Sequence, residues 1–302
     1  MSKFVEALEQ AARERTLGQS SDGSSSAAPV APAPAEVGAS PDPLPVTEPP
    51  PGLLALDEHL VSLLKPTSFE AEQYRALRHL IELFHRTNGL SVVAVSSPVA
   101  NDGKTTTAIN LAGALAQDPQ ARVLLVDADL RRGDLAGHLG LHENSARGFV
   151  DAILDGMLTL DAVVKRRPPF NLSVVPAGTL PSAPYEVLKV PRVGELLAAA
   201  RQAYDFIVLD TPPLVSVPDC RVIEKWVDGF LVVVAAHKTP RKLLEEALSV
   251  TEPAKVIGLV FNGDERPLSG YSYGYGHGYG QSTNGSTGGW KFFRRGRSAA
   301  RT

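Results

Sequence analysis

Hydrophobic and polar positions follow two different periods along the middle of this chain. Helix-like spacing, with apolar residues three or four apart, covers 104–116, 184–202 and 240–250. Short runs that are apolar at almost every position lie between these segments. The runs fall at 91–96, 122–126, 171–175, 206–209, 230–235 and 256–261. Continuous apolar strands that alternate with helices predict an α/β fold, with a mostly parallel sheet covered by helices on both faces.

Two further helices are predicted before the first strand, near 54–65 and 68–86. The chain preceding them is rich in Ser, Ala and Pro and poor in large apolar side chains, so it cannot offset the entropy of ordering. At the other end of the protein, the C-terminal residues form a Tyr/Gly repeat followed by a basic, aromatic stretch. We therefore expect a short amphipathic helix over 1–17, a disordered linker over 18–52, a globular domain over 53–265 and a flexible tail over 266–302.

Composition and charge exclude several classes of protein. The 302 residues carry a formal net charge of only −3, so no global field indicates nucleic acid as a partner. One cysteine, Cys220, allows no internal disulfide and fits a reducing compartment. No apolar run approaches the roughly 18–20 residues that span a bilayer, and the charged N-terminus does not read as a signal peptide. We expect a cytoplasmic protein whose membrane association, if any, is through a partner or a surface contact.

A strand, a turn and a helix surround the sequence Asp102-Gly103-Lys104-Thr105-Thr106. Backbone N–H groups and the dipole at the start of such a helix favour phosphate. Lys104 can reach the outer phosphates, and the Thr105 hydroxyl can ligate Mg²⁺. These five residues are the predicted nucleotide-binding loop.

The loop departs from the usual G-x-x-x-x-G-K-[ST] pattern at its first position, which is Pro98. Asn101 stands where related loops often carry a second glycine. Asn is the residue other than Gly that best tolerates a left-handed backbone, so the loop can still form.

Three carboxylates follow predicted strands. Asp127 and Asp129 end one strand, and Asp210 ends another. Ligands of an open parallel sheet bind beyond the carboxyl ends of its strands, so these acids can converge on Lys104. Carboxylates and phosphate are the usual ligands of Mg²⁺. Each acid alone could instead cap a turn, but all three beside a phosphate loop indicate a metal–nucleotide site.

Three motifs together resemble the bacterial tyrosine kinases (BY-kinases) that regulate capsule and exopolysaccharide export. The motifs are Ser97-Pro…Asp-Gly-Lys-Thr-Thr, Asp127-x-Asp-Leu-Arg-Arg and Leu209-Asp-Thr-Pro-Pro, and the resemblance covers about residues 68–280. It implies a P-loop NTPase-like fold, ATP and Mg²⁺ as cofactors, and autophosphorylation on tyrosine.

The resemblance also implies roles for individual residues. Lys104 and Thr105 would bind phosphates and metal. Asp210 and one of Asp127 or Asp129 would hold the metal, and the other of that pair would take the tyrosine proton. Which of the two is the base stays open. Positioning and charge neutralisation are what phosphoryl transfer chiefly requires.

The family resemblance extends to Glu72, Arg75 and Arg78, which it implies to be part of the interface of a ring-like homo-oligomer. A spacing of three keeps these side chains along one side of a helix. A solvated charged helix face is the alternative.

In the family, a C-terminal tyrosine cluster is phosphorylated by a neighbouring subunit. The cluster here is Tyr271, Tyr273, Tyr275 and Tyr279. Intervening glycines deny this segment stable structure, so a phenol could extend into an adjacent site. The alternative is a low-complexity tail that makes nonspecific contacts. The basic and aromatic residues 290–297 could make a peripheral membrane contact or only aid solubility.

Two other functions compete with the kinase. Division-site and partition ATPases share the acidic motifs but carry a lysine five residues before the loop lysine, where this chain has Val99. A weakly active scaffold of an export complex is the second alternative. Kinases of this family without a membrane span are activated by a membrane-bound polysaccharide co-polymerase, which is the expected partner.

Overall fold

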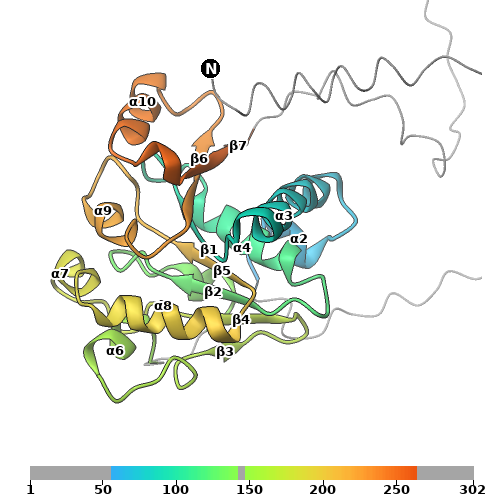
Figure 1. Ribbon diagram of the computed structural model, residues 1–302. Helices are drawn as coiled ribbons and strands as arrows, with labels where there is room; N and C mark the ends of the chain where they lie inside the picture. The colour runs from blue at the N-terminus through green and yellow to red at the C-terminus, as the bar shows by residue number, and fades with distance from the viewer. Residues whose placement is uncertain (1–55, 142–146, 264–302) are drawn as a thin grey trace, which may run out of the picture. The chain divides into compact units, whose positions relative to one another are not determined.

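The computed structural model describes residues 56–141 and 147–263, which all belong to one compact unit. Its centre is a seven-stranded sheet in the order β3-β4-β2-β5-β1-β6-β7 (Figure 1). Every pair of neighbouring strands is parallel except β3 and β4. The strands are β1 (Val92–Ser96), β2 (Val123–Asp127), β3 (Lys165–Arg166), β4 (Leu172–Val175), β5 (Phe206–Asp210), β6 (Gly229–Ala235) and β7 (Val256–Asn262).

Helices cover both faces of this sheet. Figure 1 shows α2, α3 and α4 gathered on one side of the sheet and α6, α7 and α8 on the other. The first side comprises α2 (Val61–Leu64), α3 (Phe69–Asn88), α4 (Lys104–Leu115) and α5 (Leu135–His138). The second comprises α6 (Phe149–Leu154), α7 (Pro184–Leu188), α8 (Arg192–Ala203), α9 (Asp219–Ile223) and α10 (Arg241–Ser249). The predicted fold class is confirmed.

The strands are apolar at successive positions because each face of the sheet has its own core. In β1, Val92 and Ala94 belong to the core under α6–α10, whereas Val93 and Val95 belong to the core under α2–α5. Side chains alternate between faces along a strand, so burial on both sides removes the polar alternation.

Strand order also positions the functional loops. β1 lies between β5 and β6, and β5 separates β1 from β2. The segments that leave the carboxyl ends of β1, β2 and β5 therefore meet at one edge of the sheet. In doubly wound sheets this is where ligands bind.

The predicted strands correspond to β1, β2, β4, β5, β6 and β7, and the helices predicted over 68–86, 104–116 and 240–250 to α3, α4 and α10. The helix predicted over 184–202 is wrong as one element. α7 ends at Leu188, and α8 begins after Pro191, which lacks the N–H that a continuous helix would need there.

The helix predicted near 54–65 is reduced to α2 in the part of the chain that is described. A turn closed by Leu60 N donating to Asp57 O at 3.1 Å precedes it, and Pro66 follows it. The short elements α5, α6, α9 and β3 were not predicted. The amphipathic segment 1–17, the linker 18–52 and the tail with its tyrosines lie outside the described residues. Within 56–141 and 147–263, no helix is long and apolar enough to cross a membrane.

Candidate active site

The loop between β1 and α4 is held by two left-handed residues. Asn101 has a φ of 67°, the conformation that its side chain tolerates best among non-glycine residues. Gly103 has a φ of 92°, and a Cβ built there would lie 1.9 Å from Asn262 Nδ2. The backbone therefore favours glycine at 103, where a Cβ would also displace the Asn262 side chain, while Asn101 takes the place of a second glycine.

Asp102 stabilises the loop through hydrogen bonds to other parts of the chain. Its side chain accepts hydrogen bonds from Thr239 Oγ1 at 2.7 Å and from the Val99 amide at 3.3 Å. Its carbonyl accepts one from Asn262 Nδ2 at 3.1 Å. The carboxylate is buried and is not among the groups that line the pocket described below. The Asp102 side chain is therefore used within the protein to shape the loop, and a nucleotide contact by Asp102 stays a prediction.

Lys104, the first residue of α4, is buried among carboxylates. Its Nζ lies 2.8 Å from Asp129 Oδ2 and 3.7 Å from Asp210 Oδ1, and it donates to Thr105 Oγ1 at 3.2 Å. Burial alone would lower the pKa of the ammonium. The charges of Asp210 and Asp129 outweigh that effect and raise the Lys104 pKa above its ordinary value. The lysine is fully protonated at neutral pH.

Asp210 ends β5 and is 2% exposed. Burial raises its pKa to about 6, although Lys104 and a hydrogen bond from Thr105 act in the opposite direction. Its Oδ1 atom is buried and accepts no hydrogen bond from the described residues. This oxygen meets the Lys104 ammonium only as an ion pair at 3.7 Å, which leaves it a candidate ligand for a cation.

Asp127, at the end of β2, lies deeper than Asp129. Its two oxygens accept hydrogen bonds from the backbone amides of Asp129 and Leu135, each at 3.2 Å. Burial, together with the nearby Asp210 charge, raises its pKa well above the ordinary range. The side chain is fully buried and does not line the pocket. The structure therefore brings Asp129 and Asp210 to Lys104, with Asp127 behind them.

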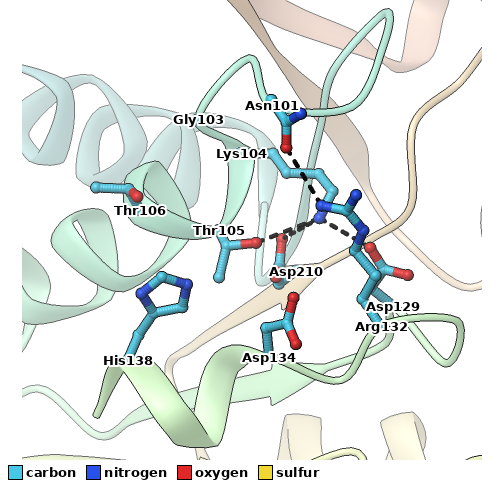
Figure 2. Close-up of a pocket in the computed structure, with 10 residues that line it drawn as sticks. All are labelled: Asn101, Gly103, Lys104, Thr105, Thr106, Asp129, Arg132, Asp134, His138 and Asp210. Carbon is cyan, nitrogen blue, oxygen red and sulfur yellow. Dashed lines mark hydrogen bonds and ion pairs between the residues drawn. The ribbon is translucent and has the colours of Figure 1, made fainter. Parts of the chain in front are cut away.

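Figure 2 shows the pocket that these groups form. It encloses about 200 Å³, which is below the roughly 300–1,000 Å³ of sites that enclose a drug-sized ligand and suits phosphate groups. Its lining residues are Asn101, Gly103, Lys104, Thr105, Thr106, Asp129, Arg132, Asp134, His138 and Asp210.

Four of these lining residues, Asn101, Arg132, Asp134 and His138, were not among the predicted site residues. Arg132 is the last residue of the acidic motif in the sequence, and this position could have indicated that its side chain lies near the site. His138 is held by Asp57, whose Oδ2 lies 2.7 Å from His138 Nδ1. A backbone hydrogen bond from His59, and then the two histidine side chains, lower the Asp57 pKa to about 2 despite partial burial. Nothing in the sequence indicated this contact across 81 positions.

The predicted interface residues all lie on α3 but differ in surroundings. Glu72 and Arg75 are exposed or half-exposed and form an ion pair with each other. Arg78 is only 19% exposed, since its guanidinium contacts Glu82 Oε1 at 2.5 Å and donates to Ala114 O at 3.0 Å. Arg78 therefore fastens α3 to α4 within the chain. The predicted acceptor tyrosines lie outside the described residues.

A buried strand, a left-handed loop and a lysine at the start of a buried helix define the class of P-loop nucleotide-binding proteins. The model of the AAA domain family matches residues 91–238. Solved structures agree with this class. The kinase domain of Escherichia coli tyrosine kinase ETK is 28% identical, with a TM-score of 0.63, over 72% of this chain and 84% of that one. The BceF tyrosine kinase domain is 27% identical, with a TM-score of 0.59, over 67% and 81%.

Curated relatives identify the family. Tyrosine-protein kinase YwqD of Bacillus subtilis is 31% identical over 211 residues, which is 69% of this chain and 87% of that protein. Tyrosine-protein kinase wzc of Salmonella typhi is 33% identical over 70% of this chain, but this chain spans only 29% of that longer protein. The chain belongs to the family of bacterial tyrosine kinases, as the resemblance of its motifs predicted.

Proposed function

We propose that the protein is a tyrosine autokinase that transfers the γ-phosphoryl group of ATP to tyrosines in the C-terminal tail of a neighbouring copy. The acceptors are Tyr271, Tyr273, Tyr275 and Tyr279. The observation that carries the proposal is the buried Lys104 held between Asp129 and Asp210, in a chain of the bacterial tyrosine kinase family. The process it serves is exopolysaccharide or capsule synthesis and export.

The residues present fit a magnesium ion bound together with nucleotide. Among the described residues, no three His, Cys, Asp or Glu side chains form a ready-made metal cage. Mg²⁺ does not need one, because it is commonly held by one or two carboxylates, water and phosphate. Asp210, whose Oδ1 accepts no hydrogen bond from the described residues, and the Thr105 hydroxyl would hold it, with Asp129 beside them. When bound, the ion would neutralise charge on the phosphate oxygens.

Lys104 and Asp129 would change partners during the reaction. Without nucleotide, the ammonium is paired with the Asp129 carboxylate. Phosphate oxygens that enter the pocket compete for Lys104 and release Asp129. The free carboxylate can then accept the phenolic proton while the tyrosine oxygen bonds to the γ-phosphorus and the bond to the ADP oxygen breaks. We therefore assign the base to Asp129.

Asp127 would act through its neighbours. Its hydrogen bonds to the amides of Asp129 and Leu135 fix the turn that carries Asp129 and the start of α5. It is better placed to position the base than to reach a phenol or a metal directly.

Assembly brings the tail to the site. We propose that copies of the chain form a ring-like oligomer in which the exposed Glu72 and Arg75 on α3 face a neighbour. Arg78 would support this face from within. Each added phosphate brings about −1.5 to −2 charges, and repulsion among modified tails would loosen the ring. The expected partner is a membrane-bound polysaccharide co-polymerase, which would recruit the protein to the cytoplasmic face of the membrane.

The rival functions make different demands. An ATPase switch of the division-site or partition type would use a second loop lysine, where this chain has Val99. A scaffold would bind nucleotide weakly and independently of Lys104. Curated relatives at 30–34% identity carry tyrosine-kinase names, which favours the kinase.

The test is incubation with ATP and Mg²⁺ followed by detection of phosphotyrosine. Wild type should be labelled, Lys104→Ala should not, and Lys189→Ala, an exposed lysine paired with Glu186, should behave as wild type. Replacing the four clustered tyrosines by Phe should remove most of the label while nucleotide binding stays. Full label in that variant would place the acceptors elsewhere. An unlabelled wild type that hydrolyses ATP would favour the switch, and equally weak nucleotide binding by wild type and Lys104→Ala would favour the scaffold.

A further inference from the structure

The pocket contains a second cation that no role assigned above uses. Lys104 and Arg132 face three carboxylates, Asp129, Asp134 and Asp210. Two of the three already surround Lys104. Among the described residues, no carboxylate forms an ion pair with Arg132. The guanidinium is therefore the positive charge in this pocket that remains available to an anion.

Arg132 is held at the pocket by its backbone. The amides of Arg132 and Gly133 both donate to Asp129 O, at 3.1 and 2.9 Å, and Gly133 continues the turn with a φ of 63°. The position of Arg132 relative to Asp129, and so to Lys104, is fixed by this turn. Its side chain crosses to the opposite wall and donates from Nη1 to Asn101 Oδ1 at 3.3 Å, as the dashed line in Figure 2 shows.

The neighbouring arginine serves a different purpose. Arg131 makes two hydrogen bonds of 2.8 Å, from Nε and Nη2, to the two oxygens of the fully buried Asp219 on α9. That pair fastens the acidic turn to the opposite layer. Arg132 makes a single long bond to a neutral amide at an exposed position. A bond of this kind is weak enough to be exchanged for a charge-assisted bond to phosphate.

We propose that Arg132 is a catalytic residue that binds the terminal phosphate of the nucleotide, with Asn101 holding it across the pocket mouth until nucleotide arrives. The charge of the pocket explains the need. A triphosphate is highly anionic, three carboxylates line the site, and the loop has Val99 where switch ATPases carry a second lysine. A planar guanidinium can bind two phosphate oxygens at once and stabilise the charge of the transferring group.

This inference extends the proposed kinase activity but can be tested without it. The measurement is the affinity for ATP and for ADP in the absence of Mg²⁺, by competition with a fluorescent nucleotide. Arg132→Ala should weaken ATP about ten-fold, as expected for the loss of a charge-assisted hydrogen bond, and should leave ADP nearly unchanged. Arg132→Lys should recover part of the loss. Arg241→Ala, a 90% exposed arginine on α10, is the matched control and should bind both nucleotides as wild type does.

Arg131→Ala separates positioning from contact. Arg131 is paired with Asp219 and does not line the pocket. Its loss should therefore lower thermal stability and reduce the affinities for ATP and ADP to the same extent. If Arg132→Ala leaves the ATP-to-ADP affinity ratio as in wild type, the assignment to the terminal phosphate is wrong, whether both affinities fall together or neither falls. Failure of the kinase function would show differently, as a wild type that lacks phosphotyrosine yet still prefers ATP through Arg132.

Discussion

Asp210 offers a sharp test, because the site needs its charge and the fold does not. Its pKa of about 6 lies well above the ordinary 3.8 because burial disfavours the carboxylate. At about 1.4 kcal/mol for each pKa unit, the ionised side chain destabilises the folded protein by roughly 3 kcal/mol at neutral pH. Asp210→Asn has nearly the same shape and no charge. We expect this variant to be more stable than wild type at pH 7.5, by up to about 3 kcal/mol, and to be inactive.

The direction of the pH effect follows from the two pKa values. Between about pH 4 and 6 the folded protein keeps a proton on Asp210 that the unfolded chain has lost, so stability contributed by this group falls as the pH rises through that window. Above pH 6 both states are ionised and the destabilisation is constant. The advantage of Asp210→Asn should therefore shrink from about 3 kcal/mol at pH 7.5 to about 1 kcal/mol at pH 4.5.

Urea unfolding followed by tryptophan fluorescence, without nucleotide, measures the difference. Asp205→Asn is the control of opposite sign. Hydrogen bonding and charge from Arg122 lower the Asp205 pKa, so neutralising it should lose stability at pH 7.5. If Asp210→Asn is less stable than wild type at pH 7.5, or if its advantage is the same at both pH values, burial does not raise the Asp210 pKa as described.

Three further outcomes follow from single contacts. Gly103→Ala should abolish nucleotide binding in a calorimetric titration, since its Cβ would meet Asn262 and its φ of 92° would be strained. Arg201→Ala should destabilise the protein by about 1–3 kcal/mol in urea, because it leaves Asp228 without its bidentate partner, yet phosphotyrosine per folded molecule should stay unchanged. Cys220, buried and with a pKa raised to about 12, should resist iodoacetamide at pH 7.5 until urea unfolds the chain.

The sequence was informative wherever one local pattern determined the outcome. Strands that are apolar on both faces predicted the covered sheet. The rule that ligands bind at the carboxyl ends of parallel strands then predicted that Asp127, Asp129 and Asp210 would converge on Lys104, and the structure brings Asp129 and Asp210 to it. Pro191 also indicated a break, because proline lacks the N–H of a helix interior, and it could have divided the helix predicted over 184–202.

The rest depended on contacts between distant segments. Asp127 and Asp129 are two residues apart with the same chemistry, and only the fold shows that one is enclosed by backbone amides while the other reaches the pocket. Arg78 and Arg75 occupy equivalent positions in the helix periodicity, but the Arg78 guanidinium donates a hydrogen bond to the carbonyl of Ala114, 36 residues away. Periodicity places a residue on a helix face and says nothing of which neighbour covers it.

The central claim is that the Lys104 site of one copy phosphorylates the tail of another. The direct measurement mixes two variants that cannot label themselves, in ATP and Mg²⁺. Lys104→Ala keeps its tyrosines but lacks the active site, and the variant with all four clustered tyrosines changed to Phe keeps the active site but lacks these acceptors. We expect phosphotyrosine in the mixture, on the Lys104→Ala chain alone, and in neither variant by itself beyond a trace. A mixture that stays unlabelled while wild type is labelled would contradict transfer between copies.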